Sequence, residues 1–264
     1  MGTLMICYFI GNVHSVWVIC DNIMCFGITM ELTLTQLPIL YSLQHCPYAM
    51  RARIAIFKSK QPVLIRAIKL NNKPAEMLAM SKKKTVPMMV FTKEGEPDSI
   101  EVLEESLDIM LAVLMQNDPN QLLEQKGCTL NDVLSLTEYF EKGLIPANEA
   151  YKCAKRYKEK NIIELREVCE VYLQELEDRL TQHSFLLSNN ESLLDIALMP
   201  FIRQFSKVER QWFQQSPYPK LRAWLNHYLQ SPMFTKIMAK HELWVDCHRD
   251  ILFGDLSRGS RSKS

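Results

Sequence analysis

Short apolar runs alternate with amphipathic stretches from Ile39 onwards, and the amphipathic stretches repeat at helical spacing. The pattern predicts the order strand, helix, strand, helix, strand, strand, helix, with a turn at Glu94-Gly95 between the last two strands. The expected elements are Ile39–Ser42, Pro47–Lys58, Val63–Ile68, Pro74–Met80, Val86–Phe91, Asp98–Val102 and Glu104–Met115. This size and order fit an α/β domain of the thioredoxin-like kind.

The pattern changes after Asp118-Pro119, where helical periodicity takes over and no convincing strand run appears up to His241. A capping-box motif at Ser192 and Asp195 precedes one apolar run, and Pro200 inside that run should kink its helix. The fold class is therefore α/β plus all-α, with an all-helical domain at 118–250 after the thioredoxin-like domain at 30–117. The expected helices are Leu130–Phe140, Ile162–Leu180, Leu193–Phe213 and Lys220–Leu229.

The two ends of the chain differ from these domains. Residues 1–29 are apolar in short bursts separated by polar residues, and neither Lys nor Arg occurs before Arg51. A secretory signal needs a basic start and a membrane span needs about 20 mostly apolar residues, so we expect neither. We interpret 1–29 as an atypical extension ahead of a working start at Met30, with a peripheral membrane contact as the less favoured alternative. Residues 251–264 are expected to form a polar tail, disordered from Ser257.

Composition narrows the class of protein. With 31 basic and 30 acidic residues the net charge is +1, which gives no electrostatic reason to expect a nucleic-acid partner. The eight cysteines form no CxxC pair and no zinc-like spacing, so we expect no metal. Scattered cysteines in a chain of this size favour a reducing compartment, and hence a cytoplasmic protein.

The strongest candidate for chemistry is Cys46, which opens the sequence Cys46-Pro47-Tyr48-Ala49 at the start of a predicted helix. Proline is well tolerated in a first turn, and the free N–H groups and dipole of a helix start favour a thiolate. Because Ala49 stands where a second cysteine would be, redox chemistry would need a resolving thiol from another molecule, such as glutathione.

Three segments carry a family resemblance: CPYAMRAR (46–53), KPAEMLAMSKKKTVPMMV (73–90) and EESLDIM (104–110). With SLLDIALMPFIRQF (192–205), they make residues 38–235 similar to bacterial glutathione transferases of the cysteine type, related to the omega class and to glutaredoxin-like relatives. The resemblance implies a thioredoxin-like domain followed by a helical domain, a homodimer, and glutathione as co-substrate. It also implies that Cys46 forms a mixed disulfide with glutathione.

The resemblance implies further roles, one position at a time. Pro87 matches the cis-proline of the fold, which would present the Val86 backbone to the cysteinyl part of glutathione. Glu105 and Ser106 match the pair that binds the γ-glutamyl end, and Lys73 matches a basic residue that can reach the glycine carboxylate. One segment departs from the family: residues 81–84 are Ser-Lys-Lys-Lys where relatives usually have Ser-Pro-Lys-Gly.

The favoured function is glutathione-dependent thiol transfer or reduction, including dehydroascorbate-type reduction, through Cys46. A conjugating transferase acting on electrophilic substrates is one alternative, and a non-enzymatic binding module is another. Conjugating relatives activate the thiol of glutathione with a Tyr or Ser hydroxyl after the first strand, so Tyr41 and Ser42 are weaker catalytic candidates. His45, next to Cys46, is an equally weak candidate for a general base.

Overall fold

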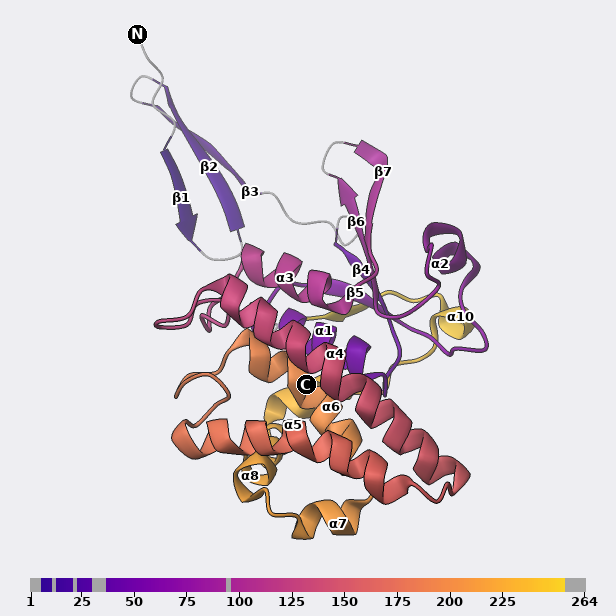
Figure 1. The fold of residues 1–264 in the computed structure, drawn as a ribbon. Helices are drawn as coiled ribbons and strands as arrows, with labels where there is room; N and C mark the ends of the chain where they lie inside the picture. Colours follow the sequence, from indigo (N-terminus) through magenta and orange to yellow (C-terminus); the bar gives the residue numbers. More distant parts are fainter. Residues whose placement is uncertain (1–5, 11–12, 21–22, 30–36, 94–95, 255–264) are drawn as a thin grey trace, which may run out of the picture.

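The computed structural model describes residues 6–10, 13–20, 23–29, 37–93 and 96–254. The first three of these ranges are the strands β1 (Ile6–Ile10), β2 (Val13–Cys20) and β3 (Ile23–Thr29), which form an antiparallel sheet in the order β1-β2-β3 (Figure 1). The sequence pattern predicted no element before Met30. The polar residues at 12 and 21–22 fall between these strands, whereas His14 lies inside β2, so the short apolar bursts are strands. The turn predicted at 94–95 and the start predicted at Met30 lie outside the described ranges.

The second sheet has five strands in the order β7-β6-β4-β5-β8. Only the β4–β5 pair is parallel, as expected for strands joined by a crossover helix. Four strands match predicted ones, but the strand at 251–253 begins where a polar tail was expected and pairs with β5. The strands are β4 (Ile39–Ser42), β5 (Val63–Ala67), β6 (Met88–Lys93), β7 (Glu96–Leu103) and β8 (Ile251–Phe253).

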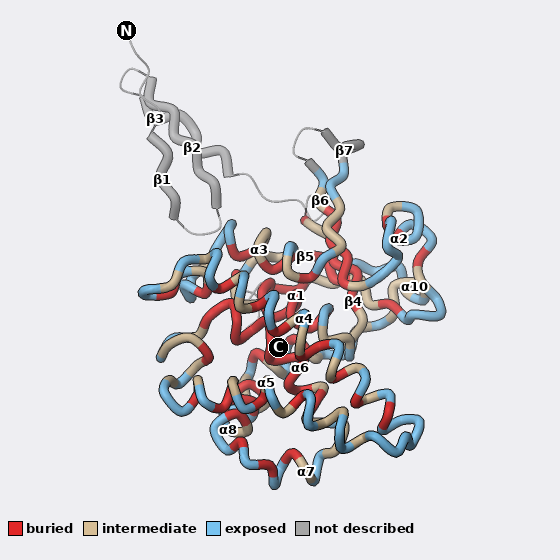
Figure 2. The backbone as a smooth tube through the Cα atoms, in the orientation of Figure 1, coloured by how far each residue is buried: buried red, intermediate tan, exposed pale blue. Residues whose placement is uncertain are grey.

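Three helices complete the α/β unit, namely α1 (Pro47–Ser59), α2 (Ala75–Met80) and α3 (Ser106–Gln116). Helices α1 and α3 pack against each other beneath the sheet, and α1 also packs against the helical domain through α6 (Leu193–Ser206) (Figure 1). The buried backbone is concentrated where these layers meet (Figure 2). The predicted thioredoxin-like unit followed by a helical domain is confirmed.

The helical domain differs from the predicted helices in two places. The helix predicted to end at Phe140 continues as one 28-residue helix, and the predicted 193–213 helix is two helices separated at 207–209. Pro200 lies inside the first of these, as predicted. Besides α6, the domain contains α4 (Leu130–Tyr157), α5 (Ile162–Gln182), α7 (Arg210–Gln215), α8 (Pro219–Leu229), α9 (Pro232–Ile237) and α10 (Trp244–Cys247). None of the helices in the described ranges is long and apolar enough to cross a membrane.

Helix α4 continues through Gly143 because this glycine lies directly against α5. A Cβ atom built on Gly143 would be only 2.3 Å from the hydroxyl oxygen of Tyr172. A side chain at position 143 therefore fits only if the Tyr172 ring moves, although glycine is a weak helix former. Packing against α5 outweighs the weak local propensity that made the sequence pattern appear to end at Phe140.

We expect Gly143→Ala to lower the free energy of unfolding by about 1–3 kcal/mol, because the added methyl group displaces the Tyr172 ring. Urea denaturation followed by circular dichroism measures this change. The double variant Gly143→Ala/Tyr172→Leu should recover part of the loss. A Gly143→Ala protein as stable as the wild type would show that α4 and α5 lie further apart than described.

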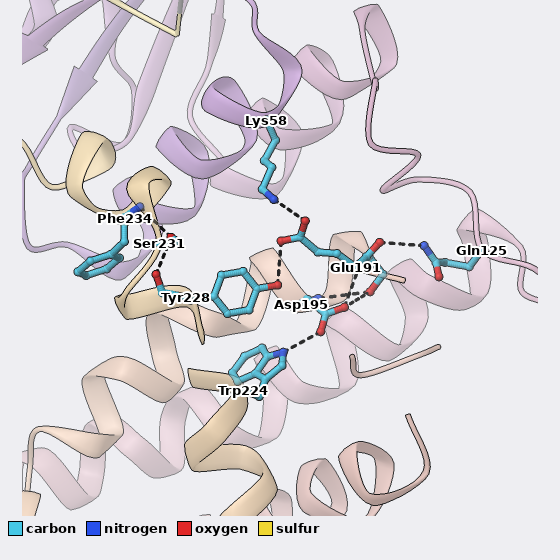
Figure 3. A network of polar contacts seen from close by, with 9 residues as sticks. Lys58, Gln125, Glu191, Asp195, Trp224, Tyr228, Ser231 and Phe234 are labelled. Atoms are coloured by element: carbon cyan, nitrogen blue, oxygen red, sulfur yellow. Dashed lines mark hydrogen bonds and ion pairs between the residues drawn. The ribbon is translucent and has the colours of Figure 1, made fainter. Parts of the chain in front are cut away.

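The capping box predicted at the start of α6 is present, and it is buried. The Ser192 side chain accepts a hydrogen bond from the backbone of Asp195, and the Asp195 carboxylate accepts from the backbone of Ser192. Asp195 is 0% exposed and also accepts from the Leu186 backbone at 2.9 Å and from Trp224 Nε1 at 3.0 Å (Figure 3). This carboxylate joins the loop before α6 to α8.

Glu191, which precedes the Ser192 capping box, connects the helical domain to the thioredoxin-like domain. Glu191 forms an ion pair with Lys58, in the last turn of α1, and accepts a hydrogen bond from the Tyr228 hydroxyl at 2.8 Å (Figure 3). Both side chains of the ion pair are largely buried. The C-terminal end of α1 is therefore held by the helical domain, while its N-terminal end carries Cys46.

Candidate active site

Cys46 lies at the N-cap of α1, immediately before Pro47. The loop that follows β4 places it there, and its carbonyl accepts the first helical hydrogen bond, from the Met50 backbone at 2.9 Å. The thiol is free and half-buried, and its Sγ atom donates to the Val86 carbonyl oxygen at 3.8 Å. Ala49, at the position of a second cysteine, is 0% exposed. The site therefore presents one thiol, with alanine at the position of a second cysteine in the motif.

A buried arginine holds the loop that carries this thiol. Arg53 is 2% exposed, and its guanidinium donates to the carbonyls of Leu43 at 3.1 Å and Gln44 at 2.6 Å. It also donates to Ser42 Oγ at 2.5 Å and to the Ile237 carbonyl at 2.8 Å, so it connects the loop to α9. Burial lowers the pKa of Arg53 to about 10, which leaves the group charged at neutral pH.

The loop between α2 and β6, residues 81–87, contains the predicted site residues Val86 and Pro87 and contacts two others, Cys46 and Lys73. Its Val86-Pro87 peptide bond is cis, as the resemblance implied. The Val86 carbonyl contacts the Cys46 thiol, and the Lys84 carbonyl accepts a hydrogen bond from Lys73 Nζ at 2.8 Å. The structure thus brings Cys46, Lys73 and Pro87 to one loop.

The same loop is tied to the start of α3. Glu104 accepts from Ser81 Oγ at 2.6 Å and from the Lys83 backbone at 2.9 Å. The pKa of Glu104 is lowered, mainly by its hydrogen bond from Ser81. The next residue, Glu105, forms an ion pair with Lys83 Nζ in which both side chains are more than half exposed. This ion pair places the Lys83 ammonium group on the carboxylate predicted to bind a ligand, whereas the departure from the family pattern concerns the neighbouring positions Lys82 and Lys84.

Ser106 begins α3 behind this ion pair. It is 2% exposed, and its Oγ accepts a hydrogen bond from Arg51 Nε at 2.9 Å. The same guanidinium forms an ion pair with Glu141 of α4. Arg51 therefore connects α1, α3 and α4 at one point. Its cation also lies over the rings of Tyr48, at 5.5 Å, and Phe201, at 5.4 Å from the centroids.

Lys84 occupies the position where relatives usually have glycine, and its φ of 55° lies in the left-handed region. A side chain there costs about 1–2 kcal/mol relative to a right-handed conformation, a penalty that glycine avoids. We expect Lys84→Gly to raise the free energy of unfolding by about 1 kcal/mol, measured by urea denaturation. Lys82→Gly is the matched control and should not stabilise the protein. Equal effects at both positions would contradict the prediction.

The weaker catalytic candidates, Tyr41, Ser42 and His45, lie close to arginine side chains. The Tyr41 hydroxyl accepts a hydrogen bond from Arg66 Nη1 at 2.9 Å, and burial raises the pKa of Tyr41. Ser42 is buried and its hydroxyl is engaged by Arg53. His45 is largely exposed. Its pKa is lowered by the partial loss of solvent around the ring and by the positive charges of Arg203, Lys207 and Arg53. Both hydroxyls are buried and accept hydrogen bonds from arginines.

Sequence reasoning did not assign roles to Arg51, Arg53 or Lys83. Both arginines lie in the CPYAMRAR segment, on a helix that is otherwise largely buried. A buried charge requires partners, so two arginines in a buried helix were a usable signal for polar connections. Lys83 carried no such signal, because a run of three lysines is ordinarily a solvated surface.

Comparison with known families identifies the class of protein. The glutathione S-transferase N-terminal domain matches residues 40–121, and the glutathione S-transferase C-terminal domain matches residues 164–227. Together the two matches span more than half of the chain, in the order that the fold requires. The chain therefore belongs to the glutathione S-transferase family. A search of curated protein sequences finds no match.

Solved structures show the same fold at low sequence identity. A glutathione transferase family member from Pseudomonas fluorescens, crystallised with two glutathione molecules, superimposes with a TM-score of 0.67 at 17% identity, covering 77% of this chain and 93% of that one. Glutathione transferase Omega 3C from Trametes versicolor gives 0.65 at 19% identity, with coverages of 79% and 92%. A Pseudomonas putida glutathione transferase, with one glutathione disulfide per subunit, gives 0.66 at 17% identity, with coverages of 78% and 93%.

Proposed function

We propose that this protein is a glutathione-dependent thiol transferase or reductase of the cysteine type, similar to the omega class. One observation carries the proposal: a free, half-buried thiol lies at the start of α1, against the Val86 carbonyl and with Ala49 in place of a second cysteine. A thiol at such a position is suited to nucleophilic attack, and its disulfide must be resolved by another molecule.

The reaction takes two thiol–disulfide exchanges. The Cys46 thiolate attacks the glutathione sulfur of a mixed disulfide, forms Cys46–S–S–glutathione, and releases the other sulfur as a thiolate that takes a proton. The thiolate of a second glutathione then attacks the glutathione sulfur of this adduct. Cys46 leaves as a thiolate and oxidised glutathione is released, so the electrons come from two glutathione molecules.

The residues around Cys46 fit glutathione in this role. The backbone of Val86 suits the cysteinyl segment, the amides at the start of α3 with Ser106 suit the γ-glutamyl carboxylate, and Lys73 suits the glycine carboxylate. Glu105 suits the α-ammonium, which would replace Lys83 on this carboxylate. Glutathione or its disulfide is bound in related structures of the same fold, which supports the assignment.

The proposal includes a cytoplasmic location and a homodimer. The five cysteines from Cys46 to Cys247 are all free, as is usual in a reducing compartment. The resemblance to glutathione transferases supports the dimer. Light scattering coupled to size-exclusion chromatography measures the mass in solution against 30.7 kDa for one chain.

The proposal is tested by incubation with oxidised glutathione, followed by peptide mapping. We expect one glutathione adduct on the peptide that contains Cys46 and none on the exposed Cys153, which serves as the internal control. An adduct on Cys153 without one on Cys46 would show that exposure alone decides reactivity, and the proposed role of Cys46 would fail.

Activity and binding assays distinguish thiol transfer from the two alternative functions. A conjugating transferase would join glutathione to an aryl halide and retain this activity in a Cys46→Ala variant. A non-enzymatic binding module would neither bind immobilised glutathione nor form the Cys46 adduct. Reduction of 2-hydroxyethyl disulfide, lost in Cys46→Ala and accompanied by little conjugation, would favour thiol transfer over both.

A further inference from the structure

A cavity of about 780 Å³ lies behind the loop that carries Cys46. Its walls are the loop residues 42–45, the end of β5 with residues 67–69, and the C-terminal segment 239–249. The C-terminal segment is fixed there, since β8 pairs with β5 and Gln44 Nε2 donates to the Met238 carbonyl at 2.9 Å. This volume accommodates a small-molecule ligand. The cavity shares its loop wall with the candidate active site, although Cys46 itself does not line it.

The lining of this cavity contains four basic and two acidic residues, so it carries an excess of positive charge. Arg53, in its wall, is buried and donates only to neutral oxygens, so no carboxylate among the described residues balances its charge. Buried charges in proteins are normally paired, and an unbalanced one favours a nearby anion. Of the two acidic residues in the lining, Glu242 is paired with Arg249, which leaves Asp246 as one carboxylate against the three cations Arg53, Lys69 and Lys240.

Two lysines extend this positive charge to the cavity rim. Lys69, after β5, and Lys240, in the C-terminal segment, both line the cavity and are exposed. Neither ammonium group forms an ion pair with the part of the chain that the structure describes. The segments that carry them are neighbours, since Ala67 and Leu243 form a β-bridge, so both cations contribute to the positive charge on this side of the cavity.

The positive charge also affects the pKa values of the two histidines in the lining, His45 and His241. Burial and the neighbouring Arg53 lower the pKa of His241, and burial, Arg203, Lys207 and Arg53 lower that of His45. Both rings are therefore neutral at pH 7 and offer hydrogen-bonding nitrogens instead of charge. The His241 Nε2 atom is buried without a hydrogen-bond partner in the described residues.

We propose that this cavity binds the carboxylate-bearing end of the second substrate, which makes the protein selective for anionic disulfides. Lys69 and Lys240 bind the carboxylate, Arg53 supplies the field behind it, and the disulfide end reacts at Cys46. This inference rests on the proposed thiol-transfer function, and it names the class of substrate that this function serves. A carboxylate at two lysines forms charge-assisted hydrogen bonds, whereas a neutral group of the same size gains little.

Two symmetric disulfides of similar size test the selectivity: dithiodiglycolate, with two carboxylates, and neutral 2-hydroxyethyl disulfide. We expect Lys69→Met and Lys240→Met each to raise KM for dithiodiglycolate by roughly fivefold, and the double variant by roughly tenfold or more, with KM for 2-hydroxyethyl disulfide unchanged. Lys160→Met removes the same charge outside the cavity and should change neither. Unchanged KM values for dithiodiglycolate in the double variant would overturn the inference.

A binding measurement separates this inference from the proposed reaction. Thiodiglycolate carries the same carboxylates on a thioether, so it cannot exchange with Cys46, and calorimetry measures its binding to the full chain. We expect binding that weakens with added salt and in the Lys69→Met/Lys240→Met variant, but not in Lys160→Met. Binding of this kind without Cys46-dependent turnover would retain the anion site and reject thiol transfer. Absence of binding would reject the site.

Discussion

Cys46→Ser is expected to lower the rate of glutathione-dependent disulfide reduction by at least about a thousandfold, because the Cys46 thiol forms the only covalent intermediate of the proposed cycle. A hydroxyl group at this position keeps the size of the side chain but does not exchange with disulfides. Steady-state reduction of 2-hydroxyethyl disulfide, coupled to glutathione reductase, measures the loss. Circular dichroism establishes that the variant remains folded.

Cys153→Ser is the matched control for this experiment. Cys153 is an exposed free cysteine of α4, outside the site, and its replacement should leave the rate unchanged. If the Cys46→Ser variant retained a substantial part of the wild-type rate, the thiol of glutathione itself would carry the chemistry. The conjugating alternative would then be favoured, with Cys46 beside bound glutathione but outside the covalent cycle.

Asp195→Ala is expected to cause the largest loss of stability, about 3–5 kcal/mol at pH 7. The carboxylate is 0% exposed and accepts four hydrogen bonds, from the Leu186 backbone, Trp224 Nε1, and the backbone and hydroxyl of Ser192. The substitution leaves these buried donors without a partner, and each unsatisfied donor costs about 1–3 kcal/mol. Urea denaturation followed by tryptophan fluorescence measures the change.

The chain contains a matched control for this prediction. Thr129 and Asp132 form the same capping box at the start of α4, but there the carboxylate is exposed to solvent. Asp132→Ala removes an equivalent cap without leaving buried donors, so its effect should be much smaller than that of Asp195→Ala. Equal losses would show that the cap itself, and not burial of the network, determines the stability.

Asp195 also predicts a dependence of stability on pH. Burial raises the pKa of Asp195 from its ordinary value of 3.8 to about 6. Between these values the folded protein holds a proton that the unfolded chain releases, so this contribution is fully present below pH 3.8 and is lost as the pH rises through 6. The wild type minus Asp195→Asn difference in unfolding free energy should therefore fall across this range. A difference that rises would contradict the assignment.

The sequence predicted those elements whose pattern is local. The strand β4 has the predicted bounds, and the α6 capping box is where Ser192 and Asp195 indicated it. Helix α4 was predicted too short because Gly143 and Pro146 weaken its local pattern, while the close approach of Tyr172 depends on a second helix. Strand β8 is only three residues long, so its pairing with β5 determines it.

The candidate site divides in the same way. The position of Cys46 at the start of a helix follows from adjacent residues, since Pro47 and the apolar spacing after it predict the helix. The contact between its thiol and the Val86 carbonyl joins residues 40 positions apart, and the Arg53 hydrogen bond to Ile237 joins residues 184 positions apart. No local pattern encodes such pairs. The Lys83–Glu105 ion pair, which occupies the proposed ammonium site, likewise depends on how two loops meet.

The sequence by itself determined the order of the domains, the helix start that presents Cys46, and the lack of a second cysteine at Ala49, because each depends on neighbouring residues or on helical and strand periodicity. Only the tertiary structure decided which groups surround the thiol, that Arg53 is buried against neutral oxygens, and that the C-terminal segment lines a cationic cavity beside the loop. These features arise from burial and from contacts between distant segments, where desolvation and packing select partners that sequence spacing does not specify.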